Sequence, residues 1–138
     1  MPGFIDDIQN QIEDYYWGAD TGSLDAPPGT WYIALFTVMP NDDGTGGTEA
    51  AFGGYARQAV ANDLTEWPAA VSGTKSNANP VDYGVASTGP TSVVGFGFYD
   101  DPTAGDLWAT ADLTGAPVSI PDGGDASFAT GAIVIDRC

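Results

Sequence analysis

The sequence predicts a mainly β fold: an antiparallel β-sandwich or jelly-roll-like domain with one N-terminal helix. The chain has 19 Gly and 10 Pro in 138 residues, which indicates many turns and therefore many short strands. Val, Thr, Ile and aromatic residues fall in short runs between those turn residues. A hydrophobic fraction of 43% argues against a disordered chain. This length fits one domain, so we expect a helix over 1–18 and a single β-sandwich over 19–138.

The N-terminal segment has the spacing of an amphipathic helix over residues 3–17. Its apolar side chains recur at helical intervals: Phe4, Ile8, Ile12 and Tyr15 or Tyr16. Pro2 suits a helix start, and Asp6 and Asp7 suit the positive end of the helix dipole. Gly18 follows the last apolar residue, as is typical of a C-terminal stop.

After a linker over 19–30, the strongest strand pattern covers residues 31–38. Alternation places two sets of apolar side chains on opposite faces, Trp31, Ile33 and Leu35 against Tyr32, Phe36 and Val38. Because both faces are apolar, we expect both to be covered. The second layer of the domain would cover one face, and the helix or a neighbouring subunit would cover the other.

Shorter strands are expected further along, after a Gly-rich loop over 40–54. Their ranges are 55–61, 81–87, 92–99, 107–114, 118–120, 127–129 and 132–136, with 62–79 irregular. Gly95 and Gly97 should share one face of their strand, where they indicate close approach of a ring or a backbone. Two sets of side chains should each share a face: Leu107, Ala109, Ala111 and Leu113 in one strand, and Ile133 and Ile135 in the last.

The charge balance is extreme, with 19 acidic residues, 3 basic residues and a formal net charge of −16. Three explanations compete with plain acidity: adaptation to molar salt, mimicry of DNA, and a calcium-loaded surface. The near absence of Lys favours adaptation to salt, because neither of the others requires Lys to be excluded everywhere. Nucleic-acid binding is not expected, since Arg57, Lys75 and Arg137 cannot form a phosphate-binding track.

The sequence indicates no catalytic site. It has no His, which removes the commonest general base, and it has neither a nucleophile-elbow motif nor a phosphate-binding loop. Cys138 is the only cysteine and the last residue, so we expect a free thiol, with an intermolecular disulfide as the alternative. Paired carboxylates of a glycosidase are the enzymatic alternative. We therefore predict a non-enzymatic protein without a required cofactor.

Calcium is the one ion that the sequence favours. The turns at 41–44 and 122–125 place carboxylates on tight turns, as a hard cation requires, and the candidate ligands are Asp42, Asp43, Asp122 and Asp125. The alternative is that Asn, Asp and Gly are simply ordinary turn residues.

No run of the sequence is apolar for the roughly 18 residues that a membrane span needs. The N-terminus also lacks the basic and apolar regions of a signal peptide. We expect no membrane partner and a protein that stays in the cytoplasm of the host cell that makes it, or in a particle assembled there.

Several segments resemble, in order, a family of small tailed-phage proteins usually labelled phage tail fibre proteins. Members have a short helix, a YVALFT-like strand and an acidic Gly-rich loop that ends in GGxYARQ. This chain has YIALFT at 32–37, an acidic loop at 42–49 and GGYARQ at 53–58. Weaker similarities follow at 95–100, 105–107 and 122–128, so the resemblance covers nearly the whole chain.

The resemblance implies a structural virion component without catalytic residues. The chain is more acidic than typical members, from which we expect a virus of a halophilic host, an archaeon. A domain of this size would serve as a fibre tip, a ring subunit or a knob decorating the capsid. Its partners would be further copies of itself and other virion proteins, such as major capsid or tail proteins. The alternative is recognition of a host receptor or glycan, with Trp67 or Trp108 stacking on sugars.

We expect homo-oligomer assembly for two reasons: the chain is too small to bury all of its aromatic residues, which make up 12% of the sequence, and the strand over 31–38 has two apolar faces. A trimer, pentamer or hexamer would bury apolar side chains that one copy leaves exposed. The expected interface residues are Tyr15, Tyr16, Trp17, Trp31, Tyr32 and Phe36. Arg57 is the candidate for a specific polar contact, because its guanidinium pairs with carboxylates in bidentate geometry. The alternative for Arg57 is a salt bridge within the chain.

The charge generates the first prediction: the melting temperature should rise between dilute buffer and molar sodium chloride. Molar salt shortens the Debye length to roughly 3 Å and screens the repulsion among like charges. Melting curves across salt, with and without a chelator, measure this. A flat melting temperature contradicts the adaptation to salt. If millimolar calcium restores the melting temperature in dilute buffer but sodium at equal ionic strength does not, the carboxylates of the turns at 41–44 and 122–125 bind calcium.

Overall fold

The computed structural model of the protein describes residues 3–22 and 24–136. Pro2, Arg137 and Cys138, on which parts of the sequence analysis depend, lie outside the described residues. The elements in chain order are β1 (Gly3–Phe4), α1 (Asp6–Gly18), β2 (Thr30–Val38), β3 (Thr48–Glu49), β4 (Gln58–Ala61), β5 (Thr74–Ser76), β6 (Val81–Val85), β7 (Thr91–Val93), β8 (Gly95–Tyr99), β9 (Leu107–Asp112), β10 (Val118–Ile120), β11 (Asp125–Phe128) and β12 (Val134–Asp136).

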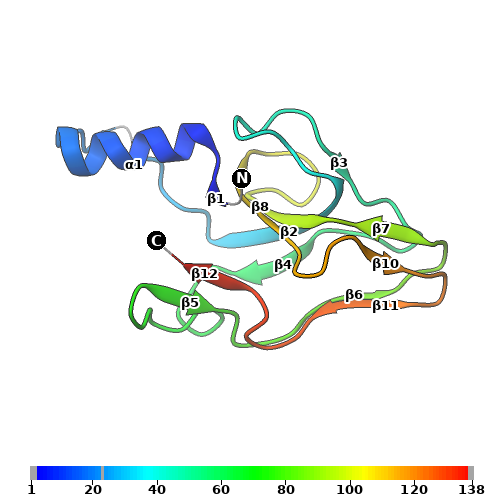
Figure 1. Ribbon diagram of the computed structural model, residues 1–138. Coiled ribbons are helices and arrows are strands. Elements are labelled where there is room, and N and C mark those ends of the chain that lie inside the picture. The colour runs from blue at the N-terminus through cyan, green and yellow to red at the C-terminus, as the bar shows by residue number, and fades with distance from the viewer. Residues whose placement is uncertain (1–2, 23, 137–138) are drawn as a thin grey trace.

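The strands form the expected mainly β, sandwich-like fold with one N-terminal helix (Figure 1). The largest sheet has the order β1-β9-β8-β2-β3, and β4 also pairs with β2. Three antiparallel pairs complete the fold: β7 with β10, β6 with β11, and β5 with β12. The main hydrophobic core lies between the large sheet and these pairs, with Ile33, Val93 and Ile133 almost fully buried.

Strand β2 is the centre of the large sheet, and both of its apolar faces are covered as expected except at Val38, which is 55% exposed at the end of the strand. Ile33 and Leu35 belong to the main core, whereas Ala34 and Phe36 belong to a second, smaller cluster. Leu107 completes that cluster, and Ile5, Met39 and Tyr99 pack against it. The second face is therefore covered by Ile5, which immediately precedes α1, and by side chains of the strands and their loops.

The expected close approach at the glycines of β8 is also confirmed. A Cβ atom at Gly97 would lie 2.7 Å from the ring of Phe36 and 2.9 Å from Leu107. At Gly95 a Cβ atom would contact the side chain of Met39. Both glycines therefore provide room for the second cluster to pack directly on the β8 backbone.

The predicted helix start was wrong. Gly3 and Phe4 form β1, which pairs with β9 opposite Thr110 and Ala109, so Phe4 does not belong to the helix. The pairing to β9 outweighs the helical pattern of the first residues, because it gives the backbone of this segment hydrogen-bond partners. The helix ends at Gly18, one residue beyond the expected range of 3–17, and Ala19, with φ 53°, caps it in place of the glycine.

The expected inward position of Leu107 was also wrong. An irregularity between Phe98 and Tyr99 makes Ala109 pair with Phe98 but Leu107 pair with Tyr99, which leaves Trp108 as the extra residue. A bulge reverses the alternation of side chains. Leu107 therefore joins the second cluster, while Ala109 packs against the main core.

Other strand limits differ by a few residues from the sequence pattern. The strand expected over 92–99 is divided at Val94 into β7 and β8, and the short strands β3 and β5 lie in segments expected to be loops. Ile133 precedes β12 and is buried, whereas Ile135 is 37% exposed, so the two do not share a buried face. In the described part of the chain, no helix has the length and apolar character that crossing a bilayer requires.

Asn77 joins two loops inside the protein. It is 2% exposed. Its Oδ1 accepts from the Ile133 amide at 2.9 Å, and its Nδ2 donates to the carbonyls of Asn79 at 2.8 Å and Ala129 at 3.0 Å. Because all these groups are paired, this buried amide fixes the chain between β11 and β12.

This arrangement predicts that Asn77→Ala destabilises the fold by about 2–4 kcal/mol, since it leaves buried backbone groups unpaired. Denaturant unfolding at constant salt measures the change. Asn79→Ala is the matched control, because Asn79 is exposed and its side chain bonds only Glu66 among the described contacts. Equal effects of the two substitutions would contradict the assigned role of Asn77.

Candidate functional site

Among the residues that the structure describes, the guanidinium of Arg57 stands out because it donates four hydrogen bonds. Its Nε and Nη2 donate to the two oxygens of Glu49 at 3.0 and 2.9 Å, a bidentate pair. Its Nη1 donates to the carbonyls of Asp101 at 2.9 Å and Ala104 at 2.8 Å. The guanidinium carbon lies 3.5 Å from the ring centroid of Tyr99. The side chain is only 7% exposed, so its contacts are within the chain.

Tyr55 connects this cluster to the centre of the sheet. Its hydroxyl donates to Glu49 Oε1 at 2.7 Å and accepts from the amide of Leu35 at 3.0 Å. Leu35 lies where the outer edge of β2 changes partner, from β4 opposite Ile33 to β3 opposite Phe36. The hydroxyl thus occupies the position of a missing strand partner and satisfies a buried amide.

The third component is the β8–β9 loop over 100–106, which presents its carbonyls to Arg57. Asp101 Oδ1 accepts from the amides of Thr103 at 2.9 Å and Ala104 at 2.8 Å, and these bonds lower the pKa of Asp101. Asp100 Oδ1 accepts from the Asp106 amide at 2.8 Å. The loop is closed on itself by its own carboxylates, and Arg57 holds it against β3.

The charges of the Arg57 cluster, which comprises Arg57, Glu49, Tyr55 and Tyr99, favour a structural role. Burial acts against the charge of Arg57, but the hydrogen bonds and charge of Glu49 outweigh it and raise the pKa of Arg57. Burial, together with the hydrogen bond to Glu49, raises the pKa of Tyr55. A permanently charged arginine and a permanently protonated tyrosine position neighbouring segments but do not exchange protons near neutral pH.

Sequence reasoning singled out Arg57 but not its partners Glu49 and Tyr55. The available signal was the motif itself, because Tyr55 lies inside GGYARQ and Glu49 ends the acidic loop just before it. The placement corresponds to the intrachain alternative considered for Arg57. No described contact tests a role of Arg57 between subunits.

The other predicted interface residues fall into three groups by exposure. Trp17 and Tyr16 are 84% and 65% exposed at the C-terminal end of α1, and Tyr15 packs edge-on against Tyr16 with ring centroids 5.0 Å apart. Trp31 and Tyr32 are half-buried, and Trp31 packs on Phe98 and Trp108. Phe36 is 2% exposed, so in this structure it belongs to the chain's own second cluster.

The two aromatic residues proposed for sugar stacking differ. Trp67 is 3% exposed and packs against Phe98, so the expectation that it is exposed was wrong; the turn over 63–66 directs it into the core. Trp108 is half-buried, and its indole nitrogen donates to Asp100 at 3.3 Å. It lines a cleft of about 700 Å³ together with Tyr99, Ile8 and several carboxylates.

The calcium candidates do not converge on one point. Asp43 Oδ1 accepts from the hydroxyl of Thr45 at 2.6 Å and from its amide at 2.9 Å, which lowers the pKa of Asp43. Asp125 lies beside Asp82, whose charge raises the pKa of Asp125. Asp42 and Asp122 lie on separate exposed turns. Within residues 3–22 and 24–136, no cluster of three or more acidic or sulfur ligands has metal-binding geometry, and calcium binding stays a prediction.

The contacts of Arg57 predict that Arg57→Lys destabilises the protein by about 2 kcal/mol. An ammonium group cannot reproduce both the bidentate pair with Glu49 and the two contacts with the β8–β9 loop. Unfolding in denaturant measures this, with Glu13→Gln on the exposed face of α1 as the control, for which we expect a change within about 0.5 kcal/mol. If Arg57→Lys unfolds at the same denaturant concentration as the control, the cluster does not hold the loops.

Comparison with known proteins agrees with the resemblance noted in the sequence. No curated protein matches the chain. One family model does match, described as Podophage GP4 fiber I protein gp80, and it covers residues 4–136. The match includes β2, the acidic loop and the Arg57 cluster, as well as all three antiparallel pairs of the second layer. The chain therefore belongs to the Podophage GP4 fiber I protein gp80 family, a family of structural fibre proteins of tailed viruses.

Proposed function

We propose that the protein is a non-enzymatic subunit of the virion surface that assembles as a homo-oligomer through the C-terminal half of α1. It would be built in the host cytoplasm and would sit on the tail as part of a fibre, or on the capsid as a turret or decoration. Family membership supports a virion fibre component, and the exposed aromatic end of α1 supports its assembly.

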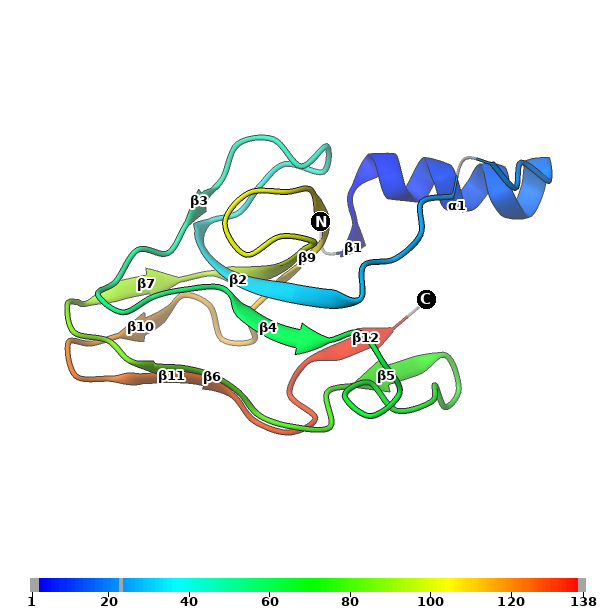
Figure 2. The same cartoon turned by 180° about the vertical axis from the view of Figure 1, so that it is seen from behind.

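The position of α1 carries this proposal. Its first turn is fixed to the body, since Ile8 is 6% exposed and the amides of Ile5 and Asp6 donate to the carbonyls of Trp108 and Asp42. From there the helix extends away from the sheets in both views (Figure 1, Figure 2). A projecting helix that ends in exposed Tyr16 and Trp17 is suited to packing against another molecule.

The segment after the helix adds to the same surface. It turns back along α1, where Gln11 and Asp25 exchange two hydrogen bonds of 2.9 Å. Leu24 is 40% exposed on this segment. Burying a large aromatic side chain contributes about 2–3 kcal/mol, so a few such contacts per copy are sufficient for a stable ring or bundle around a symmetry axis.

The alternative is recognition of a host glycan, and one observation favours it. The cleft of about 700 Å³ beneath the start of α1 combines the rings of Trp108 and Tyr99 with the carboxylates of Asp100 and Asp106. Aromatic faces and carboxylates suit sugar rings and hydroxyls. Saturable binding to host envelope that Trp108→Ala removes would favour this function; binding to virion components alone would not.

The assembly proposal predicts a discrete multiple of 14.2 kDa by light scattering in molar salt. The double substitution of Trp17 and Tyr16 by Ser should shift the population toward monomer, raising the dissociation constant at least about tenfold. Val71→Ser is the matched control, because Val71 is 75% exposed on the body. A wild-type protein that stays monomeric at high concentration, or an unchanged oligomer in the double variant, contradicts assembly through α1.

A further inference from the structure

Strand β12 has a free edge with unpaired backbone groups. It pairs with β5 along one edge, and in the described part of the chain no strand pairs with the other. Thr74 exchanges two backbone hydrogen bonds of 3.0 Å with Val71, so its N–H and C=O point away from its partner Asp136 in β12. Because bonded and non-bonded pairs alternate along an antiparallel ladder, the pair of Val134 with Ser76 is also non-bonded. The N–H and C=O of Val134 therefore point to the free edge.

The side chains beside this edge are apolar and exposed. Val134 is 56% exposed on one face of β12, and Ile135 is 37% exposed on the other. Val71 lies across β5 from β12 and does not belong to this edge. An exposed edge strand with apolar side chains is suited to association with another molecule.

The segments around this edge lack the carboxylates that are frequent elsewhere in the chain. Residues 67–81 and 126–135 contain no Asp or Glu, and Asp136 is the one acidic residue of β12. Lys75 lies directly opposite Ile135. Its Nζ donates to two backbone carbonyls at 3.0 and 3.2 Å, which leaves the third N–H of the ammonium group for another acceptor. An acidic molecule therefore meets less repulsion at this edge than at an acidic surface.

The end of α1 has features that complement this edge. The helix carries carboxylates and no Lys or Arg, and it ends in the exposed rings of Tyr16 and Trp17. Contact between two copies of α1 would bring like charges together, whereas contact with β12 would bring the carboxylates toward Lys75. The Tyr hydroxyl and the Trp indole N–H are donors, and the carbonyl of Val134 is an acceptor at the free edge.

The helix and the β5–β12 pair lie at the same end of the molecule in both views (Figure 1, Figure 2). Two copies that face each other by this end can make the same contact twice, with α1 of each copy on β12 of the other.

We propose that the end of α1 packs on the free edge of β12 in another copy of the chain, and buries Tyr16 and Trp17 against Val134 and Ile135. This inference rests on the proposed assembly through α1, because it names the surface that α1 meets.

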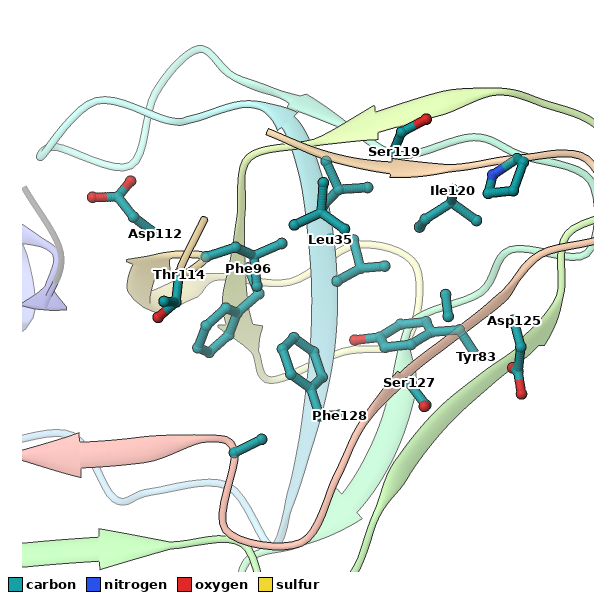
Figure 3. Close-up of a pocket in the computed structure, with 16 residues that line it drawn as sticks. Leu35, Tyr83, Phe96, Asp112, Thr114, Ser119, Ile120, Asp125, Ser127 and Phe128 are labelled. Atoms are coloured by element: carbon teal, nitrogen blue, oxygen red, sulfur yellow. The ribbon is translucent and has the colours of Figure 1, made fainter. Parts of the chain in front are cut away.

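The cleft between β10 and β11 is the rival acceptor for α1. It has a volume of about 360 Å³ (Figure 3), and Phe96 and Phe128 line it with ring centroids 5.1 Å apart. Its lining includes no Lys or Arg, so the carboxylates of α1 would gain no partner of opposite charge there. The charge therefore favours β12.

The test measures self-association of full-chain variants by light scattering in molar salt. Replacing Tyr16 and Trp17 together by Ser removes the helix surface, and Val134→Asp places a carboxylate on the edge of β12. Each change should raise the dissociation constant at least about tenfold. Val38→Asp is the matched control, because Val38 is 55% exposed at the end of β2. Val118→Asp adds the same charge at the rival cleft, and neither of these two should alter association.

A second edge variant, Ile135→Ser, keeps the test valid if Val134→Asp perturbs the strand. Circular dichroism and the melting temperature identify the variants that remain folded. Ile135→Ser should weaken association in the same direction, because Ile135 lies on the other face of the same edge.

Mixing two variants distinguishes contact between unlike surfaces from contact between like surfaces. In an equimolar mixture, the intact α1 of the edge variant can pack on the intact β12 of the helix variant. Energy transfer between differently labelled variants should therefore show mixed complexes at concentrations at which each variant alone is monomeric. Contact of α1 with α1, or of β12 with β12, predicts no mixed complexes.

The outcomes separate this inference from the proposed function. If the helix variant dissociates and the folded edge variants do not, assembly through α1 stands and the contact with β12 is wrong. Dissociation by Val118→Asp alone among the Asp variants would assign the acceptor to the cleft instead. If both surfaces matter but mixing gives no mixed complexes, the direct contact is also wrong. Dissociation of the edge variants alone, or a monomeric wild-type chain, contradicts both proposals.

Discussion

The fold depends on satisfying both edges and both faces of β2. Its faces require two separate covers, and its backbone requires a partner along each edge. One edge is paired by β8 from Tyr32 to Phe36, but the other changes from β4 to β3 between Ile33 and Phe36. Tyr83 Oη donates to the Ile33 carbonyl at 2.8 Å, and Tyr55 accepts from the Leu35 amide. These two tyrosines close the gap that the change of partner creates.

The Arg57 cluster stabilises this arrangement of β2 and the two tyrosines. Glu49 holds the Tyr55 hydroxyl, Arg57 holds Glu49, and the same guanidinium holds the loop over 100–106. A Cβ atom at Gly53, at the start of the motif, would overlap the hydroxyl of Ser87, so a side chain there would displace Ser87. The GGYARQ segment, which carries the family resemblance, is thus explained by sheet construction, and its residues need no catalytic role.

The sequence was sufficient for features that depend on local pattern. The two-faced strand β2, the turn after β8 and the tight packing at Gly97 follow from alternation and from glycine sterics. It was insufficient for features that depend on contacts between residues far apart in the sequence. The pairing of Phe4 with β9, the bulge that turns Leu107 over and the burial of Trp67 each depend on partners far along the chain. The same applies to the site: Arg57 could be selected from its rarity, but its carboxylate partner could not be identified among 19 acidic residues.

The described Arg and Lys side chains bind within the chain, and the exposed aromatic side chains of α1 lie on an acidic helix. This combination suits a virion component whose proposed role is to associate with other molecules. In the proposed assembly, association would come from burying aromatic side chains such as Trp17, because repulsion among like charges opposes it and salt would have to screen that repulsion.

A reconstruction of the virus particle at side-chain resolution tests this account most directly. We expect copies of the protein around a symmetry axis, with Trp17 of each copy buried against a neighbouring molecule and Arg57 bound to Glu49 within each copy. Copies that stand apart on the particle with Trp17 in solvent would contradict it.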